Sequence, residues 1–376
     1  MKLSDKIESI EASKTVAFTA LIQQLRQEGR EIIDLAVGEP EFDTPAPIIE
    51  STKTALDAQK TRYGPVNGLS ELRTRLAAQF SGYNTDNILL TNGSKQALYM
   101  IFQLICDPRD EVVIPVPFWV SFVEQIKLAG GKPVLVETQD HQLDDAAIAR
   151  AITPRTKAIL INSPNNPSGA VYPRTDLEKI ARLAAGHNLF IVADEAYEAF
   201  VYDGSKHASL FDIEAVRDRT IVTRSFSKSC SMTGFRIGYV AAATPIIDAL
   251  SKIQSHLSGN VCTFAQYGAL AALSLDDQLL SARCSELQQK RDIAFQYVSK
   301  LFPCIKPQGA FYIFPDVSAV LKNDETSAAL AARLLKQAGV AVVPGEAFGM
   351  ATHMRVSFAV SEENLKNGLE RIAEVL

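Results

Sequence analysis

The sequence is poor in cysteine and contains a single tryptophan, Trp119. Its five cysteines are widely scattered and form neither a CxxC pair nor a Cys/His cluster. We therefore expect free thiols in a reducing compartment and no metal site. No apolar run is long enough to span a bilayer, and the polar N-terminus lacks the apolar core of a secretion signal. These absences favour a cytoplasmic protein without a membrane-spanning segment.

The chain also lacks any block of like charge. Its 38 Lys and Arg residues are outnumbered by 43 Asp and Glu residues, which gives a net charge of −5. This balance argues against nucleic-acid binding, which usually needs a basic surface. With 376 residues, of which 47% are hydrophobic, the chain exceeds the usual size of one hydrophobic core. We expect a globular protein with two domains.

Short apolar runs alternate with helical patterns through the middle of the chain. Runs rich in Val, Ile and Leu predict strands buried on both faces of a mainly parallel sheet. The runs are 87–91, 111–115, 133–138, 157–162, 189–194, 220–223 and 237–243. Helical candidates between them cover 95–105, 119–130 and 175–188. The alternation predicts an α/β fold, a doubly wound sheet of seven strands flanked by helices.

The two ends of the chain have a different pattern. Helical and strand patterns at 327–339, 353–360 and 361–376 indicate a small α+β unit, and Ser361 suits the N-cap of the last helix. We predict a large domain over 46–275 and a small domain built from 1–45 and 276–376. One long helix near 276–301 is expected to join the two domains.

Polar residues follow several of the apolar runs. Because ligands of doubly wound sheets bind beyond the carboxyl ends of the strands, these residues are expected at one rim. Each one alone also suits a turn, a helix cap or a solvated surface position; together they favour a binding site. The residues are Gly93, Ser94, Lys95, Asn165, Asn166, Asp194, Tyr197, Ser225, Ser227 and Lys228.

Four motifs carry a resemblance to a known family. SPNNPSG (163–169), ADEAY (193–197), SFSKSCSMTGFRIGY (225–239) and HMRVSFA (353–359) occur in this order, after DLAVGEPEFDTP (34–45) and TRYGPVNGLSELR (61–73). Nearly the whole chain resembles the class I aminotransferases, pyridoxal-phosphate enzymes of fold type I. It is most similar to the gamma subgroup of bacterial aspartate aminotransferases, some of which accept prephenate.

The resemblance implies pyridoxal 5'-phosphate as the cofactor. Lys228 matches the lysine that condenses with the cofactor aldehyde, and a buried amine suits that chemistry. Asp194 matches the carboxylate that keeps the ring nitrogen protonated. Asn166 and Tyr197 match the pair that donates hydrogen bonds to the phenolic oxygen. Trp119 matches the residue that stacks on the ring, although a lone tryptophan also suits a core position.

A phosphate cup is also implied. Gly93, Ser94 and Lys95 open a helix directly after a strand, so their free NH groups suit an anion. The side chains of Ser225, Ser227 and Arg236 are expected to complete the cup. Many relatives have glycine where Ser94 stands, a change that keeps the backbone donor. Tyr63 resembles a tyrosine that reaches the phosphate of a neighbouring subunit, which implies a homodimer with shared sites; a surface loop tyrosine is the alternative.

Substrate recognition follows from the same likeness. Arg355 matches the arginine that forks onto the substrate α-carboxylate, with Gly38 beside it. Lys95 resembles the lysine near the distal carboxylate of dicarboxylic substrates, with Thr15 and Ser13 as possible hydroxyl partners. A solvent-exposed lysine at a helix start remains the alternative reading. Aspartate and glutamate, with their 2-oxo acids, are therefore the predicted substrates.

The expected reaction is a ping-pong transfer of an amino group, in which Lys228 moves the Cα proton. Aromatic, kynurenine and prephenate transamination remain alternatives, and Phe18 alone does not decide between them. A C–S β-lyase is a more distant alternative on the same fold. A regulator of DNA binding built on this fold is not expected, because the charge is acidic and no helix-turn-helix precedes residue 1.

Overall fold

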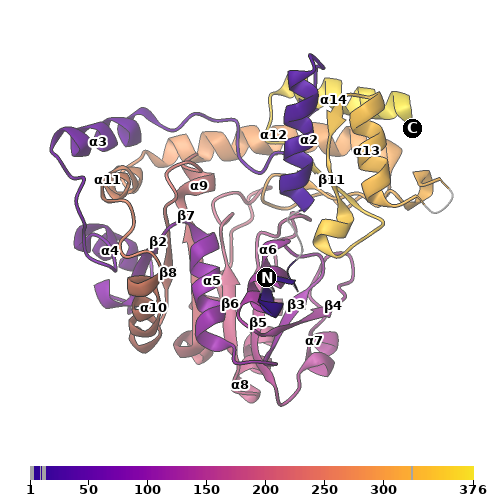
Figure 1. The fold of residues 1–376 in the computed structure, drawn as a ribbon. Helices are drawn as coiled ribbons and strands as arrows, with labels where there is room; N and C mark the ends of the chain where they lie inside the picture. The colour runs from indigo at the N-terminus through magenta and orange to yellow at the C-terminus, as the bar shows by residue number, and fades with distance from the viewer. Residues whose placement is uncertain (1–3, 9, 11–13, 323–324) are drawn as a thin grey trace.

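Seven strands form the central sheet of the computed structural model, which describes residues 4–8, 10, 14–322 and 325–376, without the side chains of 5, 6 and 14–19 (Figure 1). The strand order is β2-β8-β7-β6-β5-β3-β4, and only β8 runs antiparallel to its neighbours. The strands are β2 (Ile88–Thr91), β3 (Glu111–Pro115), β4 (Lys132–Val136), β5 (Thr156–Asn162), β6 (Phe190–Asp194), β7 (Thr220–Ser225) and β8 (Gly238–Ala241). Each lies within two residues of a predicted run, so the predicted mostly parallel sheet is confirmed.

Both faces of this sheet are buried, because the strands are continuously apolar and their successive side chains point to opposite faces. Leu160 of β5 packs into one core cluster, and its neighbours Ile159 and Ile161 pack into another. In β7, Ile221 and Val222 divide in the same way. Successive side chains of a strand point to opposite faces, so an uninterrupted apolar run supplies two cores at once.

Helices cover the two faces of the sheet. Apolar residues of α5 (Ser94–Ile105), α6 (Ser121–Leu128) and α10 (Thr244–Leu257) share a cluster with one face. The opposite face packs on α3 (Ala46–Asp57), α4 (Ser70–Ala77), α7 (Asp145–Ala151), α8 (Arg174–Gly186) and α11 (Thr263–Ala272). This three-layer arrangement leaves the strand ends, where the polar residues lie, free to form a site.

The remaining elements form two small sheets and their helices. Strand β1 (Ile33–Asp34) pairs in parallel with β10 (Val340–Ala341), and β11 (Val343–Pro344), β12 (Met354–Ser357) and β9 (Tyr312–Ile313) form an antiparallel sheet. The associated helices are α2 (Lys14–Gln27), α13 (Ser327–Gln337) and α14 (Glu362–Val375). The predicted cap is present, since the Ser361 hydroxyl oxygen accepts a hydrogen bond from the amide of Asn364 at 3.2 Å.

A long helix, α12 (Asp277–Leu301), runs between the helices beside the large sheet and the C-terminal unit (Figure 1). The predicted helix near 276–301 is therefore confirmed. The division into domains at 46–275 stays a prediction, since the apolar cluster around α12, α13, α14 and the small strands also includes Phe200 and Tyr202 of the large unit. None of the described helices is both long and apolar enough to cross a membrane.

Short helices complete the described chain. They are α1 (Asp5–Glu8), α9 (Phe226–Ser229) and the 3-10 helices η1 (Thr85–Asn87), η2 (Leu210–Asp212), η3 (Glu214–Arg219), η4 (Ser318–Val320) and η5 (Gly345–Phe348). Helix α9 follows β7 directly and carries Lys228, the lysine predicted to bind the cofactor.

Candidate active site

A cavity of about 460 Å³ lies at the carboxyl ends of the sheet strands. Asn162 ends β5, Asp194 ends β6 and Ser225 ends β7, so parallel pairing brings all three to one edge. The predicted residues that line the cavity are Gly38, Ser94, Lys95, Trp119, Asn166, Asp194, Tyr197, Ser225, Ser227, Lys228, Arg236 and Arg355. Segments from both ends of the chain therefore meet the sheet at this point.

Lys228 lies on α9, one turn beyond the end of β7. Its Nζ donates a hydrogen bond to the carbonyl oxygen of Gly38 at 2.6 Å. Burial lowers the pKa of Lys228 to about 8, and the cations Arg355, Arg236 and Lys95 add to this effect against the opposing charge of Glu39. More of the amine is therefore neutral near neutral pH than in an ordinary lysine, and the neutral form is the one that acts as a nucleophile or a base.

Asp194 is buried at the end of β6, with 4% of its surface exposed. Its Oδ1 accepts hydrogen bonds from the Ala196 amide at 3.2 Å and from the Thr223 hydroxyl at 3.3 Å. Burial raises the pKa of Asp194 to about 7, and these two hydrogen bonds only partly oppose the rise. Because both bonds reach Oδ1, Oδ2 is left for a cationic group in the cavity.

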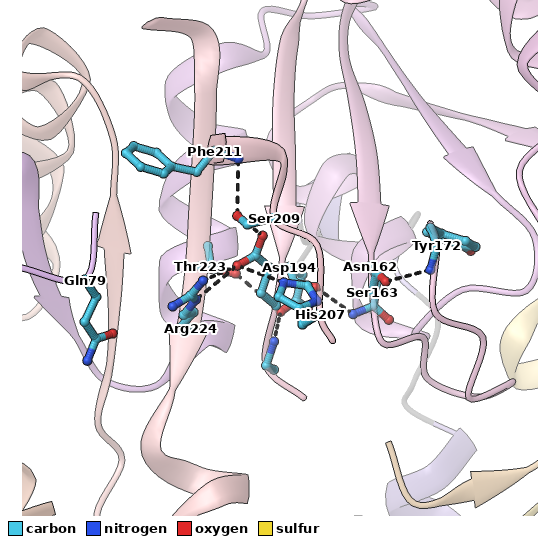
Figure 2. A network of polar contacts seen from close by, with 12 residues as sticks. Gln79, Asn162, Ser163, Tyr172, Asp194, His207, Ser209, Phe211, Thr223 and Arg224 are labelled. Atoms are coloured by element: carbon cyan, nitrogen blue, oxygen red, sulfur yellow. Dashed lines mark hydrogen bonds and ion pairs between the residues drawn. The ribbon is translucent and has the colours of Figure 1, made fainter. Parts of the chain in front are cut away.

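A buried ionic network lies beside Asp194 and was missed by the sequence analysis (Figure 2). Arg224 donates two hydrogen bonds to Glu195 Oε2 at 3.0 and 2.8 Å, and Ser209 donates one to Oε1 at 2.6 Å. His207 Nε2 lies 3.3 Å from the same Oε2. Burial alone would raise the pKa of Glu195, but these partners lower it to about 2. The ionised Glu195 thereby ties β6 to β7, the two strands that present Asp194 and Lys228.

Asn166, Tyr197 and Arg355 form one chain of hydrogen bonds. Asn166 Nδ2 donates to the Tyr197 hydroxyl at 3.2 Å, and this hydroxyl shares a hydrogen bond with that of Tyr312 at 3.0 Å. Arg355 Nη1 donates to Asn166 Oδ1 at 3.0 Å, and Nη2 donates to the Ala36 carbonyl at 2.9 Å. The Asn166 amide and the Tyr197 hydroxyl are thus fixed relative to each other at the cavity wall.

Arg355 is held on β12 with 5% of its surface exposed. Its guanidinium lies 4.3 Å from the ring centroid of Tyr312 and 5.1 Å from that of Phe348. Its Nε is buried without a hydrogen-bond partner among the described residues. A buried cation with unused donor capacity at a cavity wall is suited to bind an anion.

The start of α5 faces the side chain of Arg236. Gly93 precedes this helix with φ at +79°, and a Cβ there would lie 2.7 Å from Arg236 Nη2. Across the cavity edge, Ser225 Oγ donates to Ser227 Oγ at 2.9 Å and accepts from the Ser227 amide at 3.1 Å. Hydroxyls, a guanidinium and free helix amides gather here, as the phosphate cup requires.

Lys95 and Trp119 lie together at another part of the wall. The Lys95 ammonium is 5.1 Å from the Trp119 ring centroid. Burial, together with the charge of Arg236, lowers the pKa of Lys95. Although part of Lys95 reaches solvent, it lines the cavity with Trp119.

Three predicted residues, Gly93, Asn165 and Tyr63, do not line the cavity of the described chain, and Asn165 Nδ2 instead donates to the Pro117 carbonyl at 3.2 Å. Gly93 lies directly behind the wall, in contact distance of Arg236. Tyr63 is 97% exposed, far more than any other large hydrophobic residue noted on the surface. The side chain of Thr15 lies outside the described part of the structure, as do the side chain of Phe18 and all of Ser13.

The sequence analysis missed several lining residues. They are Ala36, Val120, Asn162, Ala196, Tyr312 and Phe348. Asn162 ends the apolar run 157–162, so the rule that selected Asp194 would have found it. Its Nδ2 donates to the Asp194 carbonyl at 3.0 Å, and its Oδ1 accepts from the Asn166 amide at 3.0 Å. Tyr312 and Phe348 gave no comparable signal, because they lie in ordinary apolar stretches of the small unit.

Comparisons with known proteins agree with this geometry. A profile of the family described as "Aminotransferase class I and II" matches residues 30–372. An aspartate aminotransferase of Geobacillus stearothermophilus is 38% identical over 99% of this chain and 98% of that protein. A probable aspartate/prephenate aminotransferase of Aquifex aeolicus is 41% identical over 100% and 98%. A structure of Thermus thermophilus aspartate aminotransferase with maleate is 39% identical, covers 100% of both chains and has a TM-score of 0.95.

Proposed function

The chain belongs to the class I and II aminotransferases and is a transaminase of the aspartate aminotransferase type, and we propose that aspartate and glutamate, with their 2-oxo acids, are its main substrates. The observation that carries the proposal is the charge of the cavity wall. Among the described residues, Lys95, Lys228, Arg236 and Arg355 line it, against one carboxylate, that of Asp194. Such a wall favours a phosphate group and a dicarboxylic substrate together.

The cavity residues fit pyridoxal 5'-phosphate, on which this family depends. Lys228 offers a partly neutral amine to an aldehyde, and Asp194 offers a free carboxylate oxygen to a protonated ring nitrogen. Asn166 and Tyr197 offer donors to a phenolic oxygen, while Ser94, Ser225, Ser227 and Arg236 would hold the phosphate. Trp119 would cover one face of the ring. When bound, the cofactor supplies an aldehyde that takes up the amino group and a ring that spreads the charge left when Cα loses its proton.

Lys228 is proposed to move the proton at Cα. Its Nζ takes the proton from Cα of the amino acid in the first half-reaction. In the reverse half-reaction it gives a proton to Cα of the incoming 2-oxo acid. The lowered pKa of Lys228 supports this role, because a base with a pKa of about 8 is available near neutral pH and still binds a proton effectively. A second 2-oxo acid then enters after the first has left, so the overall cycle is ping-pong.

Arg355 is proposed to bind the α-carboxylate of every substrate. Asn166 and the Ala36 carbonyl hold two of its nitrogens, which fixes the plane of the guanidinium. A fixed guanidinium binds a carboxylate through two parallel hydrogen bonds, and this orients Cα toward the general base. Gly38 lies beside the same anion position, where its lack of a side chain leaves room.

Lys95 is proposed to bind the distal carboxylate of aspartate or glutamate. Its ammonium is held over the Trp119 ring at the cavity wall. The Thermus thermophilus relative was solved with maleate, a dicarboxylate, which supports this substrate class for the present chain. The hydroxyl of Thr15 is proposed to donate a hydrogen bond to that carboxylate.

Trapping the cofactor tests whether Lys228 is the lysine that condenses with its aldehyde. The purified protein is incubated with pyridoxal 5'-phosphate, reduced with borohydride and digested for mass spectrometry. A pyridoxyl group on Lys228 is expected, and Lys228→Ala serves as the control. A wild-type protein without a pyridoxyl group on Lys228 would contradict the proposed function.

Lys95→Ala tests the substrate class. Losing one charge-assisted hydrogen bond is expected to lower kcat/KM for aspartate about tenfold or more, while alanine, which lacks the distal carboxylate, is little affected. An unchanged ratio of aspartate to alanine would contradict the role of Lys95. Oxaloacetate formed from aspartate and 2-oxoglutarate separates a transaminase from a C–S β-lyase, which would instead cleave cystathionine.

Prephenate is the second candidate substrate. The Aquifex aeolicus and Thermus thermophilus relatives carry aspartate/prephenate in their names, at 41% and 40% identity. Prephenate also carries a second carboxylate, which Lys95 could bind. Amino transfer from glutamate to prephenate, measured beside aromatic 2-oxo acids and kynurenine, decides among these alternatives.

We also propose a homodimer with shared sites. The almost fully exposed Tyr63 ring supports it, because an aromatic side chain of that exposure is suited to an interface. Light scattering on the purified chain measures the oligomer, and a monomer that retains full activity would contradict shared sites.

A further inference from the structure

The segment 38–44 lies between α2 and α3 and carries the acceptor of the Lys228 hydrogen bond. It contains no helix or strand, so side-chain contacts rather than backbone pairing must fix its position. Gly38 accepts the Lys228 bond at its start. Glu39 accepts a hydrogen bond from the Thr233 hydroxyl at 2.5 Å, and Thr44 donates to the Ser231 carbonyl at 2.6 Å. The segment is thus attached to residues that follow Lys228.

Helix α12 holds the same segment from its other side. The chain leading to α3 runs alongside this helix (Figure 1). Arg283 Nη2 donates to the Asp43 carbonyl at 2.6 Å, and Lys290 pairs with Glu41. The Phe42 ring lies 5.1 Å from the Arg283 guanidinium and 5.6 Å from the Lys290 ammonium. Arg283 and Lys290, which are two turns apart on the helix, therefore both contact the Phe42 ring.

Arg283 also reaches the segment that carries the lysine. Its Nη1 lies 3.3 Å from the Ser229 carbonyl and 3.3 Å from the Ser231 hydroxyl, to both of which it donates. Arg283 is 8% exposed and Lys290 is 5% exposed, so these contacts are shielded from water. One guanidinium therefore joins three parts of the chain: α12, the 38–44 segment and the residues directly after Lys228.

We propose that Arg283 and Lys290 are positioning residues that fix the 38–44 segment over Lys228. Neither lines the cavity, and both act through the position of the Gly38 carbonyl. If the segment is released, Lys228 loses its acceptor and gains access to water, and the wall next to the α-carboxylate position becomes loose. The lysine and the Gly38 wall are then linked to α12, the helix that runs between the large sheet and the C-terminal unit.

Hydrogen exchange of the protein without cofactor tests the proposal. Arg283→Gln removes the charge and the fork, and exchange of the 38–44 amides is expected to become about tenfold faster. Phe42→Leu keeps an apolar side chain and removes the ring, so a change of about threefold is expected. Arg333→Gln is the matched control, because Arg333 of α13 pairs with Glu325 and its side chain is 13% exposed.

Labelling of Lys228 by trinitrobenzenesulfonate, followed by mass spectrometry, gives a second readout. It is expected to be faster in Arg283→Gln and Phe42→Leu than in Arg333→Gln. In the enzyme with cofactor, KM for aspartate and alanine is expected to rise together, with a smaller change in kcat. A role confined to stability would lower the melting temperature of all three variants and leave labelling and KM unchanged.

The proposal rests on the proposed function only in taking Lys228 as the reactive amine. Wild-type exchange rates of the 38–44 amides in both Arg283→Gln and Phe42→Leu would overturn it. That result leaves cofactor trapping at Lys228 untouched, and failure of the trapping leaves the exchange result standing. Faster exchange in these two variants, with none in Arg333→Gln, supports it.

Discussion

The raised pKa of Asp194 makes the stability of the cofactor-free protein depend on pH. The ordinary value is 3.8, and burial raises it to about 7 in the folded chain. Between these two values the folded state keeps a proton that the unfolded state has lost. The folded state then binds more protons, so its stability falls as the pH rises. The contribution is complete below about pH 4 and is lost as the pH rises through about 7.

Asp194→Asn removes this titration and keeps an Oδ1 acceptor for Ala196 and Thr223. One pKa unit corresponds to about 1.4 kcal/mol, and about two units act between pH 5 and pH 7. The wild type is therefore expected to lose about 3 kcal/mol between pH 5 and pH 8 relative to the variant. The variant is also expected to lose most transaminase activity, because an amide cannot hold the ring nitrogen protonated.

Urea denaturation of both proteins without cofactor, at one protein concentration and a series of pH values, measures the difference. Asp218→Asn is the control, because its carboxylate is 72% exposed. The stability of the wild type relative to Asp194→Asn is expected to fall as the pH rises from 5 to 8, whereas Asp218→Asn should follow the wild type. Parallel curves for wild type and Asp194→Asn from pH 5 to pH 8 would show that the buried carboxylate does not retain its proton, and would refute the reasoning.

Three further predictions concern Arg355, Gly93 and Lys228. Arg355→Lys loses the two-nitrogen fork, so steady-state KM should rise about tenfold for aspartate and alanine alike; a selective effect on aspartate would contradict it. Gly93→Ala places a Cβ 2.7 Å from Arg236 at a φ of +79°, so titration should show about tenfold weaker cofactor binding; unchanged affinity would argue against the phosphate cup. Because the folded pKa of Lys228 is lowered to about 8, its stability cost is complete below that pH and disappears toward 10.5. Denaturation should therefore show Lys228→Met more stable than wild type at pH 7, with the gap narrowing as the pH rises from 8 toward 10.5; a constant gap would contradict the lowered pKa.

Local sequence patterns were enough to predict the sheet and most of the residues of the cavity wall. Val, Ile and Leu runs with no polar alternation are stable only when both strand faces are buried, and this local rule located all seven strands. Polar residues that end or follow the runs 87–91, 157–162, 189–194 and 220–223 then fell at one edge, because these strands run parallel. Asp194 and Lys228 were found in this way, and the family motifs assigned their expected roles.

The way in which distant segments complete the site became visible with the three-dimensional fold. Tyr312 and Phe348 stand in apolar stretches of the C-terminal unit, and nothing local distinguishes them from core residues. The Arg224–Glu195 pair and the contacts of Arg283 to residues 43, 229 and 231 join positions far apart in the chain. Periodicity and capping describe neighbours along the chain, whereas the pKa of a buried group depends on charges and burial that folding brings from elsewhere. The reactive groups could therefore be predicted from the sequence, whereas their pKa values and positions depend on the packing of the folded chain.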